Sequence, residues 1–144
     1  IACYFCHNTY VAEVIEMEMI KKQPKIKNIW CAVDCGIVIN KDSAKNMIEG
    51  SVVDGIGHAM YSKLNFENGA VTNNNFDNYN LIRHNQSPSN IQVYFVENHL
   101  SPTGLGEPGL PPSSGALANA LYKLTGKRFY TQPFSNNEDI FAGS

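Results

Sequence analysis

The chain has 144 residues, of which 43% are hydrophobic, and a formal net charge of −2. It is long enough for one domain with a core and too hydrophobic for a disordered chain. The eleven Lys and Arg residues are scattered, apart from a run at 21–27 that we interpret as a solvated strand connection. We therefore expect no nucleic-acid partner, because binding phosphates requires a basic face. No apolar run approaches the roughly 20 residues that span a membrane.

The start of the chain is abrupt. The stretch IACYFC predicts a strand almost from its first residue, and no initiating methionine precedes it. We therefore expect a piece of a longer protein, or a processed product. Its compartment, cytoplasmic or periplasmic, would then be specified outside these residues.

The cysteines leave several interpretations open. CYFCH at 3–7 matches the C-x-x-C-H pattern of covalent haem attachment. With Cys31 and Cys35 added, the spacing is that of a candidate zinc site. A disulfide is a further alternative. We favour buried thiols, because Cys31 falls in an apolar strand and cysteine is often buried as a small hydrophobe. The four histidines have no ligand spacing with one another, and we predict no metal site built from side chains.

Three strands are predicted along the chain. Residues 9–19 alternate apolar residues with Glu, which indicates a strand with a charged face outward. Residues 26–34 are a second apolar strand, and a turn between the two favours an antiparallel pair. ENG at 67–69 is a hairpin signal, and residues 91–96 form another strand.

Two helices are predicted. One begins near Asn40 or Asp42, either of which is a good N-cap, and its apolar spacing runs to residue 64. It contains Gly50, Gly55 and Gly57, and glycines inside a helix indicate that a backbone or ligand passes close. The second helix spans 113–125 and ends at Gly126.

The order of these elements predicts an α+β fold. Strands cluster rather than alternating with helices, which favours a mixed or antiparallel sheet with two main helices packed on it. We expect a single domain over residues 1–134, followed by a tail at 135–144.

Glu107 lies in the loop GLGEPGLPP, between the last strand and the last helix. Its neighbouring glycines would let a backbone come close to a ligand. Pro108, Pro111 and Pro112 would hold the carboxylate in place, as positioning a base requires. An apolar loop could also raise the pKa of the carboxyl toward neutrality. On these grounds alone, an ordinary Gly/Pro turn with an exposed Glu is the other interpretation.

Four stretches, in order, resemble the C-terminal portion of the molybdenum-binding large subunit of the xanthine dehydrogenase and aldehyde oxidase family. They are NTYVAEVIEMEM, VDCGIVINKDSAKNMIEGSVVDGIGHAMY, NFDNYNLIRHNQSP and GLGEPGLPPSSGALANALYKLTGKRFYTQPF. Within the family, the match resembles most the isoquinoline 1-oxidoreductase branch, in its beta subunit, and covers about residues 8 to 134.

The resemblance implies a reaction and a set of site residues. Members hydroxylate an aldehyde or an N-heterocycle with water as the oxygen source, and the matching glutamate, here Glu107, is the general base. The cofactor is a molybdenum–pyranopterin, with the cytosine dinucleotide form as one option. Leu105 and Gly106 match positions that touch it. Met47 stands where the family usually has a Gln that contacts the pterin, and a thioether cannot donate the hydrogen bonds of an amide.

The resemblance also implies missing partners. The family holds its cofactor between this portion and a preceding portion of the same subunit, and passes electrons to an iron–sulfur subunit or domain. We therefore expect the chain alone to carry no molybdenum and to be inactive. Its exposed cofactor-facing and inter-domain surface should be unusually apolar and could drive self-association. The alternative, motivated by Met47, is a non-catalytic interaction module. A zinc or haem protein built on the cysteines is a weaker alternative.

Overall fold

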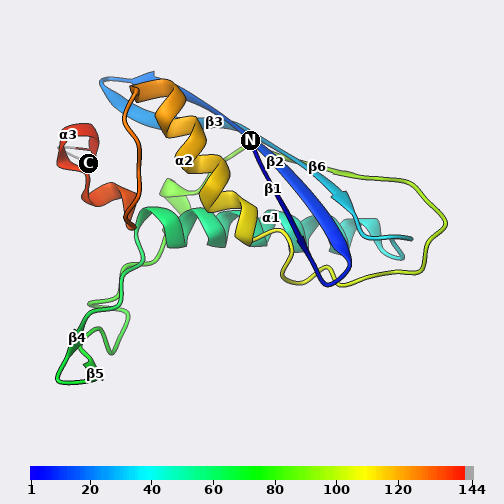
Figure 1. Cartoon of the computed structure of the whole chain (residues 1–144), viewed down its shortest axis with the longest axis horizontal. Coiled ribbons are helices and arrows are strands. Elements are labelled where there is room, and N and C mark those ends of the chain that lie inside the picture. Colours follow the sequence, from blue (N-terminus) through cyan, green and yellow to red (C-terminus); the bar gives the residue numbers. More distant parts are fainter. Residues whose placement is uncertain (142–144) are drawn as a thin grey trace.

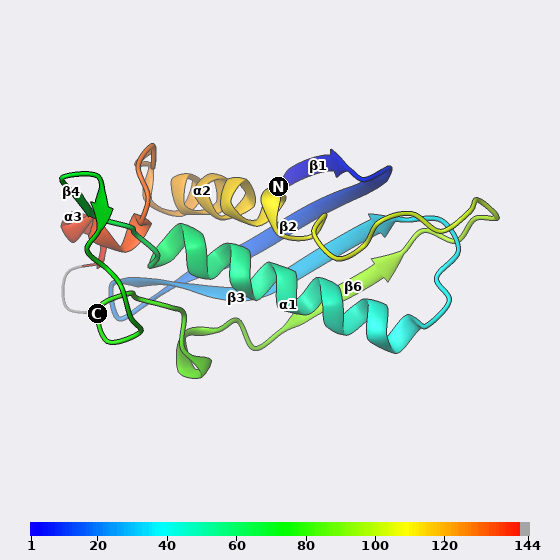
Figure 2. The same cartoon turned by 90° about the horizontal axis from the view of Figure 1, so that it is seen from below.

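A four-stranded sheet with two long helices on one face forms the body of the chain (Figures 1 and 2). The computed structural model describes residues 1–141. Its elements are β1 (Ala2–Cys6), β2 (Thr9–Ile20), β3 (Gln23–Asp34), α1 (Lys41–Met60), β4 (Phe66–Glu67), β5 (Ala70–Val71), β6 (Ile91–Phe95), α2 (Pro111–Thr125) and α3 (Glu138–Phe141), with short 3-10 helices at His84–Gln86 and Phe134–Asn136.

The sheet is mixed, with strand order β1-β2-β3-β6. β2 pairs with β1 and β3 in antiparallel fashion, whereas β6 runs parallel to β3. The predicted antiparallel pair and the predicted last strand are therefore present, with ends that differ by a few residues. The α+β prediction, with a mixed sheet and two main helices, is confirmed.

The turn between β2 and β3 uses only two residues of the basic run. Lys21 and Lys22 have φ of +49° and +68°, the left-handed conformation that two-residue hairpin turns require. Residues 23–27, the rest of that run, belong to β3. The predicted ENG hairpin is also present, because Asn68 and Gly69 form the turn between β4 and β5 with φ of +51° and +81°. Figure 1 shows this small hairpin projecting away from the body.

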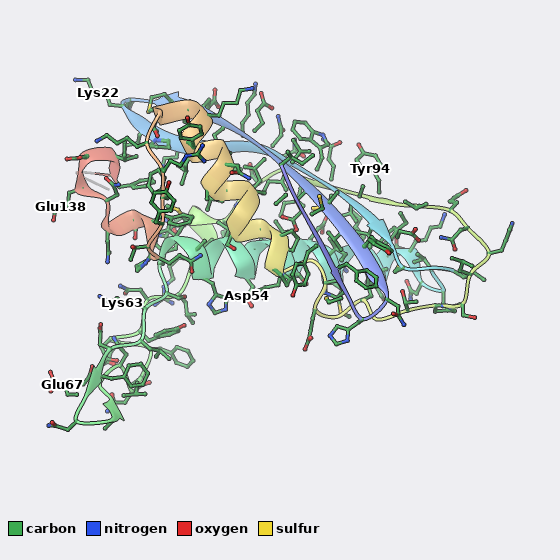
Figure 3. All side chains as sticks on the ribbon, viewed as in Figure 1. Lys22, Asp54, Lys63, Glu67, Tyr94 and Glu138 are labelled. Carbon is green, nitrogen blue, oxygen red and sulfur yellow. The ribbon has the colours of Figure 1, made fainter. Side chains whose placement is uncertain are left out.

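The two faces of the sheet differ in what covers them. Val11, Ile15, Ile29 and Val33 are buried beneath the helices. The opposite face exposes large apolar side chains, among them Tyr94, which Figure 3 shows on the side of the sheet away from the helices. Self-association of the chain through an apolar surface stays a prediction, and this face is one that could serve it. Further exposed side chains on this face are Phe5, Tyr10 and Val14.

Helix α1 begins where the sequence predicts. The Asn40 side chain accepts a hydrogen bond from the Ser43 amide at 3.0 Å, which satisfies one of the free donors of the first turn. The helix ends at Met60, four residues before the apolar spacing ends.

Two of the three glycines in α1 lie under another part of the chain. A Cβ on Gly55 would lie 2.7 Å from the Leu110 carbonyl oxygen, and one on Gly57 would lie 2.8 Å from the Ile82 side chain. Gly50 has nothing within 4 Å of that position, so the expected close approach is absent there among the described residues. Gly55 therefore lets α1 pack directly against the start of α2.

Helix α2 starts two residues earlier than predicted and ends as predicted. Pro111 and Pro112 are its first residues, positions where a missing amide hydrogen costs nothing. Gly126 follows in the left-handed conformation, with φ of +73° and its amide donating to the Tyr122 carbonyl at 2.8 Å.

The residues after α2 return to the core. Part of the predicted tail, 135–141, lies in the second 3-10 helix and α3, and Phe141 is buried with Phe129 at a ring-centroid distance of 6.3 Å. Residues 142–144 of that tail lie outside the described residues.

Glu13 contradicts the prediction that the glutamates of the first long strand face outward. It lies on the inner face with Val11 and Ile15, because side chains two apart along a strand share a face, and its exposure is 0%. Ser113 donates to Glu13 Oε1 at 3.2 Å, and Oε2 has no partner among the described residues. Burial raises the pKa of Glu13 to about 7, and the Ser113 hydrogen bond offsets only part of that shift.

A first prediction compares two glycines of the same helix. Gly55→Ala places a methyl group 2.7 Å from a carbonyl oxygen, and we expect it to lower the free energy of unfolding by about 1–3 kcal/mol. Gly50→Ala is the matched control, which should leave stability unchanged or raise it by up to about 1 kcal/mol. Urea unfolding followed by circular dichroism measures both. Equal effects of the two substitutions would contradict the packing described here.

A second prediction follows from Glu13. Its folded pKa of about 7 lies above its ordinary value of 4.5, so the folded state binds more protons between these values. Stability should therefore fall as pH rises through this window. Relative to wild type, Glu13→Gln should gain on the order of 3 kcal/mol between pH 4 and pH 8, because the amide does not ionise. Urea unfolding across pH measures this, with the exposed Glu18→Gln as control; parallel pH profiles for wild type and Glu13→Gln would rule it out.

Candidate functional site

The loop between β6 and α2 carries Glu107 and is anchored along its length. Its first part follows the end of β3, where the Ile37 amide donates to the Leu100 carbonyl at 3.0 Å and the Thr103 amide donates to the Cys35 carbonyl at 3.0 Å. The Asn98 side chain also donates to Asp34 Oδ1 at 2.7 Å. Glu107 therefore follows a segment that is tied to the sheet.

One side of the loop is held by the β1–β2 hairpin. The buried Thr9 hydroxyl lies 2.7 Å from the Thr103 hydroxyl and donates to the Gly104 carbonyl at 2.5 Å. The Gly104 amide in turn donates to the His7 carbonyl at 3.1 Å. A Cβ on Gly104 would lie 2.6 Å from the Cβ of His7, so glycine is required for this approach.

Helix α1 holds the other side of the loop. The Ser51 hydroxyl donates to the Met47 carbonyl at 2.9 Å and lies 3.4 Å from the Gly106 carbonyl oxygen. A Cβ on Gly109 would lie 3.0 Å from the Cβ of Ser51 and 3.2 Å from the side chain of Ile48. The segment 104–109 is therefore clamped between a hairpin turn and a helix.

Glu107 lies at the surface of this clamped segment. Its Oε2 is 2.9 Å from His7 Nε2, and the side chains of His7 and Glu107 are 57% and 80% exposed. The Glu107 carbonyl accepts from the Leu110 amide at 3.0 Å, which closes a turn. The predicted apolar surroundings of the carboxylate are thus absent from the described residues. Of the predicted prolines only Pro108 lies in the turn, where it is buried, since Pro111 and Pro112 begin α2.

The other predicted site residues lie beside Glu107. Gly106 is exposed, and the atom nearest to a Cβ built on it is Met47 Sδ at 3.8 Å. Leu105 is half-buried and packs against the core. Among the described residues, the amides of Leu105, Gly106 and Glu107 have no hydrogen-bond partner. Free donors beside an open glycine suit an oxygen-rich group, so the residues present fit one wall of a pterin–metal site, with Met47 contributing no donor.

The cysteines do not form one cluster. Cys3 pairs with Ala12 and Cys31 with Glu13, which puts Cys3 and Cys31 on opposite faces of the sheet. Burial raises the pKa of the Cys31 thiol to about 12, so it stays protonated at neutral pH. No group of three or more His, Cys, Asp and Glu in residues 1–141 could hold a metal ion. The haem and four-cysteine zinc interpretations therefore have no supporting geometry in the described chain.

Comparison with known proteins identifies the family of this chain. Residues 1–88 match the model of the molybdopterin cofactor-binding domain. The chain belongs to that family. No helix within residues 1–141 is long and apolar enough to cross a membrane.

Relatives of this domain carry names of oxidoreductases. The chain is 30% identical over 128 residues to the beta subunit of isoquinoline 1-oxidoreductase from Brevundimonas diminuta, covering 88% of this chain and 16% of that protein. It is 26% identical over 102 residues to a nicotinate dehydrogenase subunit of Pseudomonas putida, covering 71% of this chain and 9% of that protein. The chain thus spans less than a fifth of either relative.

Solved structures show the same fold. The aldehyde oxidoreductase of Desulfovibrio gigas superposes with a TM-score of 0.72 at 20% identity, over 87% of this chain and 14% of that one. The predicted resemblance to the molybdenum-binding family and the predicted fold class are both confirmed.

Three residues of the site were missed by sequence reasoning. In the sequence, His7 has only a place in a haem-attachment pattern, and no local signal puts it beside the loop of Glu107, 100 residues away. Thr9 and Glu13 share the strand parity of Val11 and Ile15, which was enough to place them inside.

A third prediction concerns the hairpin side of the clamp. Thr9→Val keeps the shape of a buried side chain but removes the hydroxyl that bonds Thr103 and Gly104. We expect a loss of about 1–3 kcal/mol in unfolding free energy, because the Gly104 carbonyl loses a partner. Hydrogen exchange of the Thr103 and Gly104 amides, which donate to the Cys35 and His7 carbonyls, should also become faster than in wild type, while exchange in α2 stays unchanged, as measured by mass spectrometry. Thr72→Val, in the projecting hairpin region, is the control, and unchanged exchange in the loop would show that Thr9 does not hold it.

Proposed function

We propose that this chain forms one wall of the active site of a molybdenum hydroxylase large subunit, with Glu107 as the general base. Membership of the cofactor-binding family supports the cofactor. The single observation that carries the role of Glu107 is its place: an outward carboxylate on a segment held on one side by α1 and on the other by the β1–β2 hairpin. The backbone that carries the base is therefore held in position, which helps to place a group for proton transfer.

The proposed reaction inserts an oxygen atom from water into a C–H bond of an aldehyde or an N-heterocycle. Two electrons leave the substrate carbon and two protons are released. The relatives named for isoquinoline and nicotinate support an N-heterocyclic substrate, and those named for aldehydes support an aldehyde. When bound, the molybdenum–pyranopterin group, with the cytosine dinucleotide as one form, supplies the two-electron chemistry and activates the oxygen.

The residues of this chain would then bind and move a proton. The free amides of Leu105 and Gly106 would hold oxygen atoms of the cofactor, and the open Gly106 would let it approach the backbone. Met47 would pack against it without donating a hydrogen bond. Glu107 Oε1, which has no partner among the described residues, would accept one of the two protons released in the reaction.

The rest of the site would come from elsewhere in the same subunit. Glu107 and Gly106 are exposed in the described chain, and the chain covers 16% of the isoquinoline relative. A preceding portion of the subunit would close the site, and an iron–sulfur subunit or domain would take the electrons. The chain by itself would hold no molybdenum and have no activity.

A second candidate is an interaction module that kept the scaffold and lost the cofactor. Met47, which cannot donate, and the exposed apolar face of the sheet support it. Molybdenum analysis of the assembled protein separates the two candidates. About one molybdenum per subunit supports the hydroxylase, and none in a fully assembled protein supports the module.

A fourth prediction tests the base. In the assembled enzyme, Glu107→Gln keeps the size of the side chain and removes its ability to accept a proton, so kcat should fall by about 10²–10⁴-fold. Steady-state oxidation of an aldehyde and of an N-heterocycle measures this. Molybdenum content should match wild type, and Glu67→Gln in the projecting hairpin is the control. Full turnover by Glu107→Gln would make Glu107 an ordinary loop residue.

A further inference from the structure

His7 occupies the two-residue turn between β1 and β2. Cys6 pairs with Thr9, so only His7 and Asn8 lie in the turn, with φ of +52° and +58°. This is the left-handed region, which most side chains avoid but His and Asn tolerate. A two-residue turn between paired strands leaves little freedom, and the direction of the Cα–Cβ bond of His7 is therefore set by the sheet.

The backbone of the turn is docked on the loop that carries Glu107. The Gly104 amide donates to the His7 carbonyl at 3.1 Å, and the Cβ of His7 fills the space where a Cβ on Gly104 would lie. Thr9, at the base of the turn, bonds Thr103 and Gly104. These contacts bring the backbone of the His7 turn beside the loop of Glu107 independently of any attraction between the two side chains.

The hydrogen bond between the two side chains joins His7 Nε2 to Glu107 Oε2 across 2.9 Å. A carboxylate that acts as a base can only accept, so in the proposed role of Glu107 the imidazole is the donor. Glu107 Oε1 has no partner among the described residues. The imidazole thus occupies one oxygen of the carboxylate and leaves the other available.

An exposed pair of this kind contributes little to folding. Ion pairs between exposed side chains contribute little to stability, and both side chains are more than half exposed in the described chain. The hairpin is already fixed by the backbone and threonine contacts. The remaining effect of the imidazole is to restrict the rotation of the Glu107 carboxylate.

We propose that His7 is a positioning residue for the proposed base, which holds Glu107 by Oε2 so that Oε1 faces the reacting proton. The inference rests on the proposed function of Glu107. It gives the histidine of the C-x-x-C-H pattern a role that involves neither haem nor zinc. No other ion-pair partner of either side chain exists within residues 1–141.

The test uses two substitutions in the assembled, molybdenum-loaded enzyme. His7→Asn suits the left-handed turn but is too short to reach Glu107, and His7→Gln carries an amide that can reach it. We expect His7→Asn to lower kcat by about 10–100-fold with KM within about threefold, because a misplaced base slows the reaction without weakening substrate binding. His7→Gln should retain kcat within about fivefold of wild type.

A control and a second readout keep the result specific. His58→Asn replaces an exposed histidine that pairs with Asp54 on α1 and should leave kcat unchanged. Molybdenum content and Tm of both His7 variants should match wild type. A wild-type kcat in His7→Asn, equal losses in both His7 variants, or loss of molybdenum in both would overturn the inference, since none of these follows from carboxylate positioning.

Glu107→Gln separates this inference from the proposed function. If Glu107→Gln keeps full turnover, the proposed base is wrong and the inference falls with it. If Glu107→Gln is inactive and His7→Asn is fully active, Glu107 remains the base and only the role of His7 is overturned.

Discussion

The close approach of α1 to the start of α2 at Gly55 is the constraint on which the site depends. The Leu110 carbonyl and Ser113 occupy the space that a side chain at position 55 would need. Because α2 begins at Pro111, this contact sets how near the preceding loop lies to α1. Gly106 then lies near Met47, and Gly109 lies near Ser51. Glu107 lies between these two glycines in the loop.

The same contact places a polar centre beneath the loop. The Ser113 hydroxyl lies within hydrogen-bond distance of both Glu13 Oε1, at 3.2 Å, and the Gly109 carbonyl oxygen, at 3.1 Å, so one hydroxyl links β2 to the end of the clamped segment. A buried carboxyl with one unpartnered oxygen is costly when ionised. The strand, the helix start and the loop are therefore coupled through a group whose charge changes near neutral pH.

Most of the fold could be predicted because its signals are local. The positions of the strands, the Asn40 cap and Gly126 each depend on neighbours in sequence, and the structure agrees with all of them. Glu13 is predicted to face outward because it is charged. Its position two residues from both Val11 and Ile15 instead puts it on the buried face of the strand. Gly50 is a second wrong prediction. A glycine inside a helix indicates a close contact, but the described chain has no atom within 4 Å of a Cβ built on Gly50.

The candidate site was less predictable because it is made by contacts distant in sequence. Glu107 could be singled out from its own loop and from the family resemblance. Its contact with His7 joins residues 100 positions apart, and only the arrangement of hairpin and loop reveals it. The exposure of Glu107 also depends on what surrounds it, which the pattern of the loop does not encode.

The parallel pairing of β6 with β3 has a consequence for the order of assembly. β1, β2 and β3 are joined by two-residue turns and can form early, whereas β6 must wait for the whole of α1 and the projecting hairpin to be placed. Contacts that close long loops form slowly, because chain entropy is lost before they contribute. The segment with Glu107 follows β6, so we expect the β1–β2 turn and α1 to be in place before the last element of the site arrives between them.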